Sequence, residues 1–145
     1  MLVNTSSLNG FWASLGPGVP HTAYSTAKFA VKGLSEALIE DLRVHAPHVR
    51  VAVVLPGHVG TDIVANSMMA FGVPEADAVA ANRGFHDSAP LSAAGAATVI
   101  LDGVRSGAWR ILVGQDAHGL DQYVRAHPED AYDYAKLAAA IQADG

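Results

Sequence analysis

The chain has 145 residues, of which 50% are hydrophobic and 16% are charged, so it is long and apolar enough to fold around one core. Its net charge of −5 and its scattered basic residues argue against nucleic-acid binding, and the absence of cysteine excludes disulfides and thiolate metal sites. No apolar run reaches the roughly 20 residues needed to cross a bilayer, and the first ten residues lack the features of a signal peptide. We therefore expect a single cytoplasmic domain over residues 1–145 that binds neither nucleic acid nor membrane.

The first residues predict the end of a buried strand followed by a loop. Leu2 and Val3 are apolar from the start, and the polar run Asn4–Ser7 follows at once. Because a domain normally begins with a few solvated residues, we expect further chain to precede this strand. Residues 8–22 hold three glycines and two prolines, a density of breakers that is typical of a loop.

A long helix and a second strand come next. Apolar residues recur every three or four positions from Tyr24 to His45, which predicts a helix that Pro47 ends. The run Val49–Leu55 is nearly all apolar and contains four valines, as is typical of a parallel strand buried on both faces. The order strand, loop, helix, strand predicts a βαβ unit.

The second half continues this alternation. Residues 62–88 have weak helical character around the apolar group Met68–Phe71. A helix is predicted over Ser92–Ser106, with Ser92 as its N-cap and Gly107 just past its end. The segment Trp109–Val113 predicts a third strand, and Glu129–Ile141 a last amphipathic helix. The fold class is therefore α/β with a parallel sheet.

Tyr24 and Lys28 form the strongest chemical signal. Residues four apart on a helix share one face, so both side chains can meet one ligand. A neighbouring ammonium group favours the phenolate form of a tyrosine, as acid–base chemistry at a carbonyl or alcohol requires. Such a pair also arises by chance, but Ser7 and Thr61 follow two predicted strands. Ligands of open parallel sheets bind at this carboxyl edge, where Tyr24 is also expected.

Three motifs in order resemble the second half of the short-chain dehydrogenase/reductase family. They are N-x-S-S at Asn4–Ser7, Y-S-x-x-K at Tyr24–Lys28 and P-G-x-V-x-T at Pro56–Thr61, and Arg110–Gly114 looks like the family's last strand. The resemblance covers essentially the whole chain. It implies part of a Rossmann-like, doubly wound parallel sheet and hydride transfer between NAD or NADP and an alcohol or carbonyl substrate.

The resemblance also implies roles for single residues. Ser7 matches the catalytic serine that hydrogen-bonds the substrate oxygen, with Ser6 as the alternative. Tyr24 matches the residue that exchanges a proton with that oxygen, and Lys28 the residue that holds the nicotinamide ribose and favours the phenolate. The positions matching the family's cofactor-binding residues are Tyr24, Lys28, Pro56, Gly57, Val59 and Thr61.

Two departures from the family pattern matter. The loop between Ser7 and Tyr24 is a few residues longer than is usual. The Gly-rich turn that holds the pyrophosphate of a dinucleotide is absent, because Gly16 and Gly18 lie in a loop broken by proline. We therefore expect the C-terminal catalytic half of a Rossmann-type dehydrogenase. The alternative is a catalytically silent remnant or an oligomerising interaction module.

Several features fit either a functional or a structural role. Residues 62–88 match the family's substrate lid, and its methionines suit an apolar substrate, but they also fit ordinary core. The resemblance also implies that the helix Tyr24–His45 packs against a second copy of the chain; the alternative is that it merely covers the sheet. His58 is placed to touch cofactor or substrate. The other histidines lack a metal-ligand spacing, so we expect no metal site.

Overall fold

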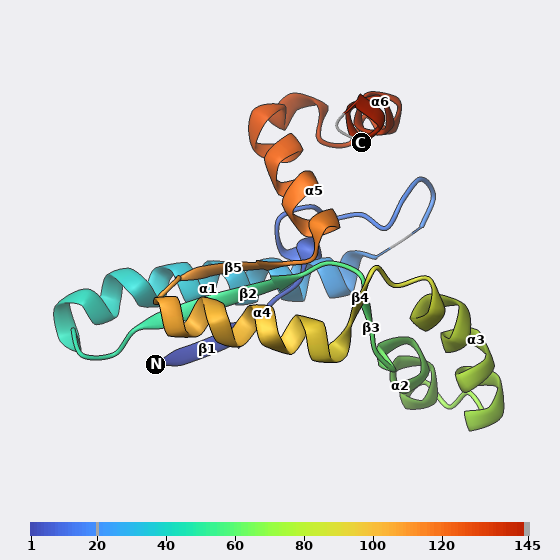
Figure 1. Cartoon of the computed structure of the whole chain (residues 1–145), viewed down its shortest axis with the longest axis horizontal. Helices are drawn as coiled ribbons and strands as arrows, with labels where there is room; N and C mark the ends of the chain where they lie inside the picture. Colours follow the sequence, from blue (N-terminus) through green and yellow to red (C-terminus); the bar gives the residue numbers. More distant parts are fainter. Residues whose placement is uncertain (20, 144–145) are drawn as a thin grey trace.

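The computed structural model describes residues 1–19 and 21–143 and has an α/β fold built on three parallel strands. The strands are β1 (Leu2–Thr5), β2 (Val51–Pro56) and β5 (Arg110–Val113), in the spatial order β1-β2-β5 (Figure 1). Leu2 pairs with Val51, and Val53 pairs with Arg110. The predicted parallel α/β fold is confirmed, with the middle strand beginning two residues later than expected.

Helices α1 (Thr22–His45) and α4 (Ala93–Ser106) cover opposite faces of this sheet. Side chains alternate between the faces of a strand. Ala52 and Val54 of β2 belong to a core cluster against which α4 packs. On the other face Asn4, which pairs with Val53, donates to the hydroxyl of Ser35 in α1 at 3.1 Å. Buried on both faces, β2 has to be apolar throughout.

The ends of α4 are those that the sequence predicts. The Ser92 hydroxyl accepts a hydrogen bond from the backbone N–H of Gly95 at 3.1 Å, and so caps the helix. Gly107 follows the helix with φ of +80°, a left-handed conformation that favours glycine.

Two further helices lie beyond the carboxyl ends of the main strands (Figure 1). They are α2 (Ile63–Ala70) and α3 (Glu75–Asp87), and they form a hairpin where the sequence indicates only weak helical character. The short strands β3 (Val59–Gly60) and β4 (Leu91–Ser92) pair in parallel at its base. Buried Asn82 fixes the hairpin, because its side chain bonds the Ala65 N–H at 3.3 Å and the Asp62 carboxylate at 3.2 Å.

The C-terminal segment forms a second layer of packing with the first loop. It consists of α5 (Gln115–Ala126), the 3₁₀ turn η2 (Pro128–Asp130) and α6 (Tyr134–Ala143). Trp12, which follows the 3₁₀ turn η1 (Leu8–Gly10), is buried against Leu120, Tyr123 and Leu137. Its indole N–H donates to the carbonyl of Ala131 at 2.6 Å. The first loop is therefore held in place by residues more than 100 positions away.

One helix and one helix boundary in this segment differ from the predictions. Helix α5 is absent from the sequence prediction altogether. The last helix begins at Tyr134 and not at Glu129, because the carboxylate of Asp133 accepts the backbone N–H groups of Ala135 and Lys136 at 3.1 Å each. Across the described ranges, no helix combines the length and apolar character that a membrane crossing requires.

Candidate active site

A cleft of about 630 Å³ lies at the carboxyl ends of β1 and β2, between α1, α4 and the α2–α3 hairpin. Segments that are far apart in the sequence meet there. All the residues that the sequence marks as catalytic or cofactor-binding line this one cleft, namely Ser7, Tyr24, Lys28, Pro56, Gly57, Val59 and Thr61.

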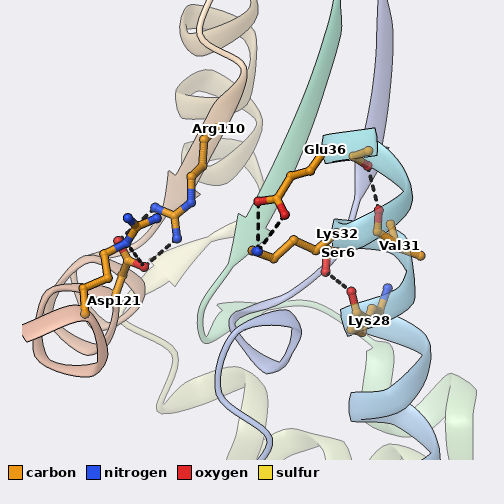
Figure 2. A network of polar contacts seen from close by, with 9 residues as sticks. Ser6, Lys28, Val31, Lys32, Glu36, Arg110 and Asp121 are labelled. Carbon is orange, nitrogen blue, oxygen red and sulfur yellow. Dashed lines mark hydrogen bonds and ion pairs between the residues drawn. The ribbon is translucent and has the colours of Figure 1, made fainter. Parts of the chain in front are cut away.

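The two candidate serines have different hydrogen-bond partners. Ser6 points at α1 and donates its hydroxyl to the carbonyl of Lys28 at 2.7 Å (Figure 2). Ser7 caps η1, because its oxygen accepts the backbone N–H of Asn9 at 3.2 Å. The hydroxyl hydrogen of Ser6 is thus used in a hydrogen bond within the fold. The hydrogen bond of Ser7 uses only its oxygen, so its hydroxyl hydrogen can still be donated to a ligand. This arrangement favours Ser7 as the serine that faces a ligand.

Tyr24 and Lys28 meet on the face of α1 that borders the cleft. The Lys28 ammonium lies 5.4 Å from the centre of the Tyr24 ring. It also donates to the carbonyl of Thr5, the last residue of β1, at 3.3 Å. Both side chains are partly buried, so they are held in place yet remain open to the cleft.

His21 is a neighbour of Tyr24 that the sequence analysis did not single out. Its ring stacks on the Tyr24 ring, with centroids 4.6 Å apart and planes 16° from parallel. Burial lowers the pKa of His21 from its ordinary value of 6.5, so the neutral imidazole dominates at pH 7. The position of His21, one helical turn before Tyr24, is the only signal that could have suggested this contact.

The turn Pro56–Gly57–His58 forms another wall of the cleft. The backbone N–H of Gly57 donates to the carbonyl of Val113 at 2.8 Å, and that of His58 donates to the carboxylate of Asp116 at 2.6 Å. His58 lines the cleft as well, and its ring nitrogen Nε2 lies 2.7 Å from the carbonyl of Phe85. The sequence places His58 near the site but gives no hint of Asp116.

The rest of the lining is largely apolar. The titratable side chains that line the cleft are those of His21, Tyr24, Lys28 and His58, and no carboxylate of the described residues does so. The apolar part of the wall is formed by Leu8, Leu15, Ile63, Val64, Met68, Phe85, Ala96 and Ile100. Over the described residues, no group of three or more His, Asp or Glu side chains is arranged to hold a metal ion.

Comparison with known proteins identifies the family. A family model described as short chain dehydrogenase matches residues 1–70. A crystal structure of a short-chain dehydrogenase/reductase from Burkholderia phymatum in complex with NAD has the same fold, with a TM-score of 0.65 and 28% identity over 88% of this chain. The chain belongs to the short-chain dehydrogenase/reductase family. The match covers 46% of the Burkholderia protein.

Curated relatives in this family give the same picture. The "Putative oxidoreductase SadH" of Mycobacterium tuberculosis is 35% identical over 139 residues, which is 96% of this chain and 47% of the relative. A 3-ketodihydrosphingosine reductase of Bacteroides thetaiotaomicron is 41% identical over 66 residues, or 45% of this chain and 22% of that enzyme. The chain thus spans less than half the length of these relatives.

Proposed function

We propose that this chain is the proton-transferring part of a cytoplasmic NAD- or NADP-dependent oxidoreductase that interconverts an alcohol and a carbonyl compound. One observation carries the proposal. The serine, tyrosine and lysine of the family motifs line the same cleft as the turn that matches the family's nicotinamide-binding residues. The family relationship and the oxidoreductase names of the relatives support it.

The residues of the cleft fit the nicotinamide end of the cofactor. Lys28 offers an ammonium group for ribose hydroxyls, and Thr61 offers a hydroxyl for the carboxamide. Gly57 and Val59 bring backbone groups close to the same space. The nicotinamide ring supplies the hydride acceptor or donor, which no amino-acid side chain can provide.

Proton transfer belongs to the side chains of this chain. In the reducing direction the Tyr24 hydroxyl donates its proton to the substrate oxygen, and in the oxidising direction the phenolate takes it back. Ser7 donates a hydrogen bond to the same oxygen and orients it. Lys28, 5.4 Å from the Tyr24 ring, stabilises negative charge on the phenolate.

The cleft favours a small, largely apolar substrate. Its walls are mostly aliphatic, and part of them comes from Ile63, Val64 and Met68 of α2. We assign residues 62–88 as a lid that covers the substrate, since residues of both α2 and α3 line the cleft. Both helices lie beyond the carboxyl ends of the main strands (Figure 1). The name of the Bacteroides relative refers to reduction of a keto group, in agreement with this reaction class.

The decisive experiment is Tyr24→Phe in the complete natural protein. We expect turnover of NAD(P)-linked alcohol or carbonyl substrates to be abolished while nucleotide affinity stays nearly unchanged, because only the proton donor is lost. Tyr132→Phe is the matched control, because it removes a hydroxyl that accepts the backbone N–H of Ala13 and does not line the cleft. If Tyr24→Phe retains a tenth or more of the parent rate, Tyr24 is not the acid/base.

A second candidate role rests on the outer face of α1. Phe29 is 41% exposed, Leu34 58% and Val44 72%, and within α1 only Ser25 and Ser35 are buried. Since apolar side chains exposed along a helix mark interaction sites, we propose that a second copy of the chain packs here. An oligomerising module without catalysis would still self-associate through α1 but would have no oxidoreductase activity.

Sedimentation velocity tests this role. We expect the complete natural protein to be oligomeric and Leu34→Glu to shift it toward monomer, because a buried charge in such an interface is unpaired. Glu40→Gln, an exposed change on the same helix, serves as the control. Equal sedimentation of wild type and Leu34→Glu would remove α1 as the interface.

A further inference from the structure

The carboxylate of Asp116 lies behind the turn that lines the cleft. Its Oδ2 atom accepts the backbone N–H of His58 at 2.6 Å. A Cβ atom added to Gly57 would lie 2.2 Å from Oδ2, and one added to Gly114 would lie 2.4 Å from Oδ1. The carboxylate therefore fills the space that the two glycines leave, and it joins the start of α5 to the Pro56–Gly57–His58 turn.

The position of this carboxylate is not explained by packing alone. Asp116 lies in the first turn of α5, where the helix dipole favours a negative charge. Its Oδ1 atom is buried, and no partner for it is present among the described residues. A buried acceptor without a partner has an energetic cost, so an apolar side chain would fill this space more favourably. The bond to His58 supplies the reason for an acid here.

His58 continues the connection from the turn to α3. A carbonyl oxygen only accepts hydrogen bonds, so Nε2 of His58 carries the hydrogen that bonds the carbonyl of Phe85 at 2.7 Å. The His58 and Phe85 rings also pack, with centroids 4.2 Å apart. Gly60 allows α3 to approach the turn closely. A Cβ atom added to Gly60 would lie 3.3 Å from the carbonyl oxygen of His86.

We propose that Asp116 and His58 are positioning residues that hold the cleft turn in place and tie the α2–α3 hairpin to it. Asp116 fixes the backbone of the turn from the side of β5 and α5. The His58 ring connects the last turn of α3 to this cleft turn through its contacts with Phe85. Asp116 does not line the cleft, so it acts through the turn and not on the ligand. The effect on turnover rests on the proposed function, whereas the two structural connections do not.

Hydrogen exchange resolved by residue tests the connections without reference to catalysis. In Asp116→Ala we expect exchange of the His58 amide to rise at least tenfold, because its acceptor is lost. Asp116→Asn keeps an acceptor oxygen and should retain most of the protection. Gln115→Ala, in the same helical turn, is the control. If Asp116→Ala does not fold, Asp116→Ser replaces it. Unchanged exchange of His58 overturns the role of Asp116.

Steady-state kinetics of the complete natural protein test the consequence. Asp116→Ala should lower kcat by about 10- to 100-fold, because a displaced turn misaligns the reacting groups. His58→Phe should mainly raise the substrate KM, and His58→Gln, which can still donate to Phe85, should restore it. Looser exchange with unchanged kcat and KM overturns the positioning role. A wild-type protein without oxidoreductase activity would instead remove the proposed function and leave the exchange result standing.

Discussion

At the scale of single residues, His21 links the cleft to the pH dependence of stability. Its burial disfavours the imidazolium, which holds the pKa of His21 below 6.5. Between the folded and unfolded pKa values the unfolded chain binds more protons, so acid favours unfolding. The contribution of His21 to stability is complete above about pH 6.5 and is lost as the pH falls through the lower folded pKa.

The substitution His21→Phe tests this contribution. Phenylalanine keeps a ring on Tyr24 but cannot take up a proton, so the variant should lose less stability than wild type between pH 7 and pH 5. Thermal unfolding at both pH values measures the difference. His118→Phe, at an exposed site in α5, is the control for replacing a histidine by phenylalanine. Equal slopes for His21→Phe and wild type would contradict the prediction.

Two contacts in and beside the cleft show how far the sequence predicts the positions of single residues. The spacing of Tyr24 and Lys28 is local, and one helical turn brings them together whatever the rest of the fold does. The contact of Asp116 with His58 joins residues 58 positions apart. It depends on where β5 ends and α5 begins, which no short pattern of residue types encodes.

At the scale of elements, α4 was predictable and α5 was not. Both ends of α4 carry local signals, a capping serine and a glycine with positive φ. Helix α5 begins directly after Gly114, has no side-chain cap and contains His118 and Gly119 in its first half. Tertiary contacts stabilise it, because Leu120 and Tyr123 are buried against Trp12. Such stabilisation is absent from any window of the sequence.

A buried ion pair fastens α5 to β5 (Figure 2). Arg110 bonds both carboxylate oxygens of Asp121, at 2.8 and 2.5 Å, and Arg125 adds a third bond at 3.0 Å. Burial alone would raise the pKa of Asp121, but the two arginines outweigh it and hold that pKa below its ordinary value of 3.8. The contribution of the pair is therefore present above about pH 3.8 and lost as the pH falls through the lower folded value.

Breaking this pair on one side should be costly. We expect Asp121→Leu to lower the free energy of unfolding by about 3–5 kcal/mol, because it leaves the Arg110 guanidinium buried without a partner. The double variant Arg110→Met/Asp121→Leu should recover much of that loss. Urea unfolding at pH 7 gives both values. Asp102→Asn, in an exposed pair with Arg105, is the control. A double variant as unstable as the single one would show that packing, and not charge, is lost.

At the scale of the whole molecule, β1 and β5 are the two edge strands of the described sheet, and the β1 edge is apolar and exposed. Strand β1 pairs only with β2, and its Leu2 and Val3 are 46% and 41% exposed. An apolar strand edge of this kind is a site for pairing with further strands or with other chains. The cleft lies at the end of this same strand. Under the proposed function, the 145-residue chain therefore supplies one wall of the nucleotide site and leaves the side beyond β1 open.

We therefore expect the 145-residue chain by itself to bind nicotinamide nucleotides only weakly. In dinucleotide folds a Gly-rich turn at a helix N-terminus holds the pyrophosphate, and this sequence has no such turn. The remaining candidate partners line the cleft, and under the proposed function they face the nicotinamide end alone; they are Lys28, Gly57, Val59 and Thr61. Dissociation constants above about 1 mM, or less than about 4 kcal/mol of binding free energy, should result. Calorimetric titration with NAD, NADH, NADP and NADPH measures them, with Lys28→Ala as the reference for the nicotinamide contacts. Micromolar binding of any of the four nucleotides would reveal a phosphate-binding element outside the Gly-rich pattern.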